Sequence, residues 1–256
     1  RTLKYVSDEL KADKEVVMIA ISNDGNALQY ASDGLKADEE VVMRAISCEG
    51  LNEYSYCIKY ALKEFNPSKE MVIAIVSKIG DALEYASDKF KADKEVVVAA
   101  ISCEGLNDYS YCIKYALNEF NPSKELVITI VSKLGGALEY ASDKFKADKE
   151  VVMAAISNKS SALEYASDEL KVDKEVVIAA VSKVGSLLEG LAQELKNDKD
   201  VVLPAVKQNG TALKFAADKL KADKDIVVAA VSNRGDALQY AHSELQNDPD
   251  ILALKE

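Results

Sequence analysis

The pentapeptide DKEVV occurs at residues 13–17, 93–97, 148–152 and 173–177. Close variants are DEEVV at 38–42, DKDVV at 198–202 and DKDIV at 223–227. Self-similarity at a fixed period is the sequence signature of repeat architectures. The pentapeptide therefore indicates one short structural unit that has been copied along the chain.

The first residue of the pentapeptide, called the marker here, lies at the same point of every repeat. The markers are Asp13, Asp38, Ser68, Asp93, Ser123, Asp148, Asp173, Asp198, Asp223 and Asp248. Their spacing is 25 residues, except for the 30-residue spacings that follow Asp38 and Asp93. Residues 46–97 and 101–152 differ at six of 52 positions, so a block of two repeats was duplicated whole. We predict that residues 1–256 form a single array whose repeats start near the markers.

Each repeat is predicted to begin with a helix. An Asp or Ser marker can accept a hydrogen bond from an unpaired N–H of the first turn, and Asp248-Pro249 fits because proline at the first helical position loses no hydrogen bond. A glycine twelve residues after the marker is expected to end this helix in the left-handed conformation. These glycines are Gly25, Gly50, Gly80, Gly105, Gly135, Gly185, Gly210 and Gly235; Ser160 is the exception.

A second helix is predicted after the glycine, as in residues 26–35, where Leu28, Ala31 and Leu35 recur at helical spacing. The expected caps are Asn26, Asp81, Ser161, Ser186, Thr211 and Asp236. A single helical hairpin cannot bury its apolar face alone, so neighbouring repeats must share one core. We therefore predict an all-α, right-handed α-solenoid of about ten 25-residue helix-turn-helix repeats, two of them with a five-residue insertion.

The composition limits the partners. Hydrophobic residues make up 48% of the chain, and the net charge is −11, which disfavours binding to nucleic acid. No apolar run approaches the roughly 20 residues of a spanning helix, so we expect no membrane insertion and a soluble protein inside a cell or organelle. The chain starts in a predicted second helix, 1–10, and stops in a first helix, 251–256. We therefore expect a segment or subunit of a larger assembly.

The repeat carries a recognisable pattern, D-K-E-V-V-x-A-A-V-x-x-x-G-x-A-L-x-Y/F-A-x-x-x-L. Its closest instance is DKDVVLPAVKQNGTALKFAADKL at residues 198–220. This pattern resembles the repeat family called domain of unknown function 4116. The resemblance covers essentially the whole chain and implies tandem helical hairpins. It implies no activity, and the 30-residue repeats depart from the pattern.

No residue is predicted to be catalytic, and no cofactor or metal site is expected. The single histidine, His242, lies where other repeats have serine, and most carboxylates lie at cap or first-turn positions. Cys57 and Cys112 replace a small residue and are interpreted as buried packing residues. The spacing leaves open a disulfide between Cys48 and Cys57, and likewise between Cys103 and Cys112. A shared zinc site is disfavoured because the pairs lie two repeats apart.

The insertions, residues 51–55 and 106–110, are the strongest candidates for function. Asn52 and Asn107 are expected to cap a second helix that is one turn longer. The candidate partner-binding residues are Leu51, Tyr54, Tyr56, Leu106, Tyr109 and Tyr111. Tyrosine is enriched at protein interfaces, which supports an aromatic contact surface. A plain extension whose tyrosines lie on neighbouring repeats is the alternative.

A series of tyrosines runs through the repeats and breaks once. It comprises Tyr5, Tyr30, Tyr60, Tyr85, Tyr115, Tyr140, Tyr165, Gly190, Phe215 and Tyr240. Gly190 lacks the ring, and Pro204 lies inside the next predicted first helix, where proline removes a hydrogen bond. We hypothesise a kink or shallow pocket near Gly190 and Pro204; neutral drift is the alternative.

These observations favour a non-enzymatic scaffold that binds other proteins. The first alternative is a structural spacer without a specific surface partner. The second is a small-molecule binder or an enzyme that uses the irregular groove near Gly190 and Pro204.

Overall fold

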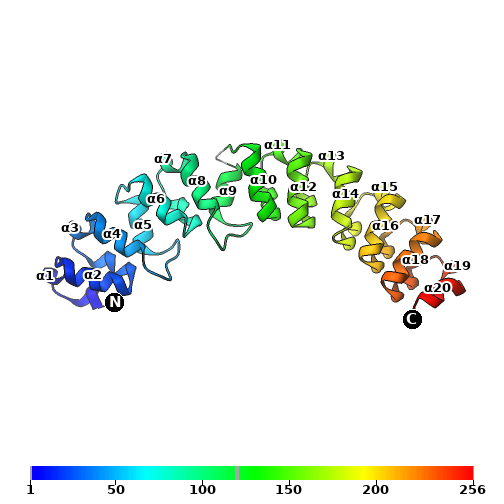
Figure 1. Cartoon of the computed structure of the whole chain (residues 1–256), viewed down its shortest axis with the longest axis horizontal. Coiled ribbons are helices and arrows are strands. Elements are labelled where there is room, and N and C mark those ends of the chain that lie inside the picture. Colours follow the sequence, from blue (N-terminus) through cyan, green and yellow to red (C-terminus); the bar gives the residue numbers. More distant parts are fainter. Residues whose placement is uncertain (1, 119–120, 256) are drawn as a thin grey trace. The chain divides into compact units, whose positions relative to one another are not determined.

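The computed structural model describes residues 2–118 and 121–255. All elements in this part of the chain are helical, and the units recur about every 25 residues, which confirms the prediction of an all-α repeat solenoid. The chain divides into two compact units, residues 1–121 and 122–256, both made of the same repeats. Within each unit, successive repeats stack in chain order (Figure 1). That residues 1–256 form a single array, and that the solenoid is right-handed, remain predictions.

Each repeat begins with a first helix that starts directly after the marker. These are α2 (Lys14–Asn23), α4 (Glu39–Ile46), α6 (Lys69–Val76), α8 (Lys94–Ile101), α10 (Lys124–Lys133), α12 (Lys149–Asn158), α14 (Lys174–Val181), α16 (Lys199–Gln208), α18 (Lys224–Asn233) and α20 (Pro249–Leu252). Every marker side chain accepts a hydrogen bond from a backbone N–H of the following turn. The predicted capping role of the markers is therefore confirmed.

The second half of a 25-residue repeat is not one helix, so that prediction was wrong. It consists of a 3-10 helix and a one-turn α-helix. The 3-10 helices are η2 (Gly25–Tyr30), η3 (Gly80–Tyr85), η4 (Gly135–Tyr140), η5 (Ser160–Tyr165), η6 (Gly185–Gly190), η7 (Gly210–Phe215) and η8 (Gly235–Tyr240), with η1 (Thr2–Tyr5) and η9 (Ala253–Lys255) at the ends. The one-turn helices are α1 (Asp8–Lys11), α3 (Asp33–Lys36), α7 (Asp88–Lys91), α11 (Asp143–Lys146), α13 (Asp168–Lys171), α15 (Gln193–Lys196), α17 (Asp218–Lys221) and α19 (Ser243–Gln246).

In the 13–37 repeat, a hydrogen bond to the preceding repeat lies at the break between the two pieces. Ala31 and Ser32 are extended, with ψ of 159° and 157°. The Ser32 N–H donates to the Lys11 carbonyl of the preceding repeat at 2.9 Å, so it does not continue the 3-10 helix. The Ser32 hydroxyl instead accepts from the Leu35 N–H and caps α3. In this repeat, a hydrogen bond between repeats thus takes the place of one within a continuous helix.

The predicted caps after the glycine were also wrong in position. The residue before the glycine caps η2 and η7: Asp24 accepts from the Asn26 N–H at 3.0 Å, and Asn209 accepts from the Thr211 N–H at 3.2 Å. Asp81, a predicted cap, instead accepts from the Cys112 N–H of the following repeat at 3.2 Å.

The glycine at the start of the 3-10 helix allows two backbones to approach closely. A Cβ built on Gly80 or Gly135 would lie 2.5 Å from the carbonyl oxygen of Ala100 or Ala155 in the next first helix, where a real Cβ cannot fit. Among the described glycines, only Gly50 and Gly105 have positive φ, of 71° and 78°. These two glycines, both in 30-residue repeats, adopt the predicted left-handed conformation. They lie four residues after α4 and α8 end, so they do not end those helices.

The 30-residue repeats have a regular second helix, α5 (Tyr56–Lys63) or α9 (Tyr111–Asn118). The N-cap of α5 is Ser55, without a side-chain cap hydrogen bond. The prediction that Asn52 caps a longer helix was therefore wrong for α5. Asn66 and Asn121, which follow these helices, adopt positive φ of 55° and 50°, a region that asparagine visits more readily than most residues.

The core lies between first helices and the second halves of the repeats. In α12, Val151, Val152 and Ala155 are fully buried. In the second half, Leu28 and Ala31 are also buried, as the helical spacing predicted, and Leu35 is half-buried. Apolar faces of neighbouring repeats thus cover one another, the condition for solenoid stability.

An ion-pair ladder joins the N-terminal ends of consecutive first helices. The first residue of most first helices is a lysine, which pairs with the next repeat's marker aspartate and with the acidic residue two positions further. Lys124 Nζ, for example, lies 2.7 Å from Asp148 and 2.9 Å from Glu150. The others are Lys14 with Asp38 and Glu40, Lys69 with Asp93 and Glu95, Lys149 with Asp173 and Glu175, Lys174 with Asp198 and Asp200, Lys199 with Asp223 and Asp225, and Lys224 with Asp248 and Asp250.

Candidate protein-binding surface

The first insertion forms a compact turn that holds Tyr54 outward. The Asn52 side chain accepts from the Tyr54 N–H at 3.0 Å, and the Asn52 N–H donates to the Ser55 hydroxyl at 3.0 Å. Ser55 is buried, whereas the Tyr54 side chain is 69% exposed. The Ser55 hydroxyl is engaged in this turn and makes no cap hydrogen bond to α5, and the bonds fix the turn without burying the ring.

The second insertion repeats this turn. The Tyr109 N–H donates to Asn107 Oδ1 at 2.8 Å, and the Asn107 N–H donates to the Ser110 hydroxyl at 3.2 Å. Ser110 is buried and Tyr109 is 66% exposed. The same geometry therefore presents a tyrosine ring at both insertions.

The other predicted contact residues are less accessible. Tyr56 and Tyr111 are half-buried, and their rings stack on Tyr60 and Tyr115, with centroids 5.8 and 6.0 Å apart. Partial burial raises the pKa of Tyr56, and Glu64 adds to the rise. These two rings belong to the α5 and α9 surfaces and not to an exposed ridge.

The leucines of the insertions are half-buried as well. Leu106 lies against the preceding repeat, where its Cδ2 is 3.1 Å from the position of a Cβ on Gly80. Leu51 lines a small cavity with Ile75 and Ile79 of the following repeat. Of the six predicted residues, only Tyr54 and Tyr109 are therefore largely open to a partner.

A lysine accompanies each exposed ring, a feature that sequence reasoning missed. Lys59 Nζ lies 5.4 Å from the Tyr54 ring centroid and 4.9 Å from that of Tyr85, in the next repeat. Lys114 Nζ lies 5.8 Å from the Tyr109 centroid. Both lysines lie five residues after their tyrosine, so one turn of α5 or α9 carries each ammonium back to the ring. The surface thus combines an aromatic face with a positive charge.

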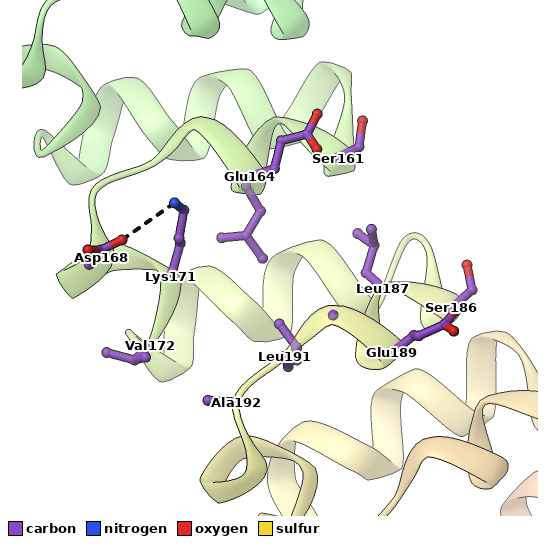
Figure 2. A pocket seen from close by; sticks show the side chains of 12 residues that line it. Ser161, Glu164, Asp168, Lys171, Val172, Ser186, Leu187, Glu189, Leu191 and Ala192 are labelled. Atoms are coloured by element: carbon purple, nitrogen blue, oxygen red, sulfur yellow. Dashed lines mark ion pairs between the residues drawn. The ribbon is translucent and has the colours of Figure 1, made fainter.

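A groove of about 630 Å³ lies beside Gly190, between the second halves of two repeats. Figure 2 shows Ser161 and Glu164 of η5 on one side and Leu187, Glu189 and Leu191 on the other. Gly190 lines this groove, but Pro204 does not. The two residues paired by the hypothesis therefore do not share a pocket.

Pro204 lies inside α16, half-buried, and α16 runs without interruption from Lys199 to Gln208. The helix is therefore not broken at the proline.

All four cysteines are free thiols, so the disulfides that the spacing left open are absent. Cys57 Sγ lies 3.3 Å from the position of a Cβ on Gly25, and Cys112 Sγ lies 3.1 Å from that on Gly80. Both are fully buried, as predicted. Burial raises the pKa of Cys57 to about 12 and also raises that of Cys112, so both remain protonated at neutral pH.

Cys48 and Cys103 occupy a connecting position, ten residues after the marker. Their thiols donate to the carbonyl oxygens of Ile21 and Lys78 in the preceding repeats. In other repeats an asparagine does the same: Asn158 Nδ2 donates to the Lys133 carbonyl and Asn233 Nδ2 to that of Lys207. Each of these cysteines therefore donates a hydrogen bond to the preceding repeat.

Residues 2–118 and 121–255 include the single histidine of the chain, His242. His242 is exposed, and its Nδ1 lies 3.9 Å from Glu244. Residues 2–118 and 121–255 hold no cluster of three or more His, Cys, Asp or Glu side chains suited to a metal ion. None of their helices is both long and apolar enough to cross a membrane.

The fold and surface define a helical-repeat protein. The family described as Domain of unknown function (DUF4116) matches residues 1–35, 13–66, 68–121, 123–171, 173–221 and 223–252. The chain belongs to this repeat family, as the sequence pattern indicated. Searches of curated proteins and of solved structures find no match.

Proposed function

We propose that the chain is a non-enzymatic scaffold that binds another protein through the two insertion turns. The observation that supports this proposal is the outward tyrosine on each turn, 69% exposed at Tyr54 and 66% at Tyr109. Tyrosine supplies a large amphipathic contact at low entropic cost and is common among the residues that dominate binding energy.

The rigidity of the turns supports the proposal further. Each ring is carried by a turn closed by asparagine and serine hydrogen bonds, so little conformational entropy is lost on binding. The nearby lysine adds a charge that selects acidic or carbonyl-rich partner surfaces. Repeat proteins commonly place insertions on their binding face.

A double variant tests the proposal. Tyr54→Ser/Tyr109→Ser removes both rings and leaves the buried serines and asparagines of the turns in place. We expect affinity purification from the source organism to recover a partner with the unmodified chain and to lose it with the double variant. Deletion of residues 51–55 and 106–110 should have the same effect.

The matched control is Tyr5→Ser. Tyr5 is 80% exposed and also has a lysine over its ring, Lys4 Nζ at 5.6 Å, but it lies outside the insertions. This variant should keep the partner. Retention of the partner by the double variant would contradict the proposal, and absence of any specific partner for the unmodified chain would favour the structural spacer.

A further inference from the structure

The ring that other repeats carry at the end of the 3-10 helix is missing from the 173–197 repeat. Tyr165 and Phe215, the equivalents in the flanking repeats, are half-buried. A Cβ built on Gly190 would meet nothing within 4 Å, and φ of Gly190 is not positive. Neither packing nor backbone conformation therefore requires glycine, and its effect is to leave open the space of one ring.

The walls of this space are more apolar than in other repeats. Leu187 and Leu191 stand where the neighbouring repeat has Ala212 and Ala216, and both are half-buried along the groove. Val172, at the opposite wall, leaves 55% of its surface exposed. Figure 2 shows Leu187 and Leu191 on one side of the groove, with Val172 on the facing repeat. Exposed apolar surface of this kind, edged by polar residues, is typical of a binding site.

The edge of the groove is acidic. Asp168 pairs with Lys171 at 3.5 Å, so the one cation that lines the groove is already neutralised. Glu164 and Glu189 are exposed, and neither has an ion-pair partner within residues 2–118 and 121–255. An occupant should therefore carry positive charge next to its apolar part.

We propose that this groove, called the Gly190 socket here, binds an aromatic side chain of another polypeptide that is flanked by lysine or arginine. The guest ring occupies the place left by the missing tyrosine, between Val172 and Leu191. The flanking cations meet Glu164 and Glu189. This site is separate from the insertion turns, because all of its lining residues belong to residues 122–256 and the turns belong to residues 1–121.

Methyl NMR on the full chain tests the socket with a defined probe, the blocked tripeptide Lys-Tyr-Lys at millimolar concentration. We expect shifts at the methyl groups of Val172, Leu187 and Leu191. Lys-Ala-Lys should cause no such shifts, because it has no ring. Glu-Tyr-Glu should bind at least about threefold more weakly than Lys-Tyr-Lys, as expected for the loss of exposed ion pairs.

Gly190→Tyr is the decisive variant. It restores the ring of the other repeats in open space, so the fold should be retained, and peptide affinity should fall by on the order of tenfold because the added ring fills the socket. Gly34→Tyr is the control, since a Cβ on Gly34 also meets nothing within 4 Å, and it should bind the peptide normally.

The outcomes separate the alternatives. Peptide binding that Gly190→Tyr leaves unchanged, or no shift at the three methyl groups, would overturn the proposal. Concentration-dependent shifts of these methyl groups without peptide, together with self-association in sedimentation, would overturn it in favour of a second copy of the chain. Tyr54→Ser/Tyr109→Ser should not alter peptide binding, so failure of the insertion-turn proposal can be told from failure of this one.

Discussion

The 25-residue and 30-residue repeats place glycine at the same distance from the marker, but for different physical reasons. Gly135 lies where a Cβ would collide with the backbone of the next repeat, 2.5 Å from the Ala155 carbonyl oxygen. Gly50 has open space around its Cβ position and φ of 71°. One glycine therefore permits close packing between repeats, and the other permits a left-handed turn.

The difference teaches how five extra residues create a surface. In the 25-residue repeat, the chain passes directly from the first helix into a 3-10 helix pressed against its neighbour, which leaves no room for a protruding turn. In the 30-residue repeat, the left-handed Gly50 directs the chain into the turn that carries Tyr54. In this repeat, α5 supplies the buried side chains of the second half in place of a 3-10 helix. Its Cys57 lies next to Gly25 of the preceding repeat.

The largest effect expected on stability comes from Gly135→Ala. The new Cβ must displace backbone at Ala155 and Lys159, where contacts would be 2.5 and 3.0 Å. Overpacking against backbone should lower the free energy of unfolding by about 3 kcal/mol. Chemical denaturation of the full chain measures the loss.

Gly34→Ala is the control for that substitution. Gly34 lies in α3 with open space around its Cβ position, so alanine should leave stability unchanged or raise it by about 0.5–1 kcal/mol. Equal losses at Gly135 and Gly34 would contradict the close-approach explanation.

Gly50→Ala should have an intermediate effect. No atom obstructs the new Cβ, but alanine must adopt positive φ, which costs about 1 kcal/mol. Gly50→Asn should cost less, because asparagine tolerates the left-handed region. A loss at Gly50→Ala as large as at Gly135→Ala, measured in the same denaturant series, would show that the two glycines do not differ as described.

The smallest effect concerns the ion-pair ladder, which is exposed. Hydrogen bonds from lysine lower the pKa of Asp148 and Asp173, and hydrogen bonds to acidic side chains raise the pKa of Lys124 and Lys149. The aspartate contribution is complete above the ordinary pKa of about 3.9 and is lost as pH falls through the lowered folded value. The lysine contribution is complete below about 10.4 and is lost as pH rises through the raised folded value.

The thermal midpoint should therefore be flat between these limits and fall at both ends, less so at high salt. Lys149→Met should slightly reduce the fall of the thermal midpoint at acidic pH. Its effect on stability should be smaller than that of Gly50→Ala. Lys94→Met is the matched control, because Lys94 has no ion pair within the described residues. An identical acid response in both variants would show that the ladder does not contribute.

Sequence reasoning recovered the repeat, the all-α class, the markers as N-caps and the burial of Cys57 and Cys112. These features depend on local chemistry or on strict periodicity, which a single sequence displays. It missed the split second half, where in the 13–37 repeat the N–H of Ser32 bonds to the preceding repeat. It also missed Lys59, which meets Tyr54 only after α5 has formed.

The candidate sites were predictable in part. The insertions could be found by comparing repeat lengths, and Gly190 by the break in the tyrosine series. That Tyr54 is exposed while Tyr56 stacks on Tyr60 could not be read from sequence, because the bonds of Asn52 to Tyr54 and Ser55 set the direction of the turn. Pro204 lies within the continuous helix α16 and does not line the groove beside Gly190.

The sequence by itself determined the repeat length, the start of each first helix and the family, because capping and hydrophobic periodicity act over a few residues. Only the tertiary structure decided why glycine stands where it does, where the second half breaks and which tyrosines face solvent. The glycine positions depend on backbone atoms of the next repeat. In the 13–37 repeat the break lies where Ser32 bonds to the preceding repeat, and the exposure of Tyr54 and Tyr109 depends on hydrogen bonds within each insertion turn. Distances across such an interface follow from packing, and packing is fixed only when neighbouring repeats share their core.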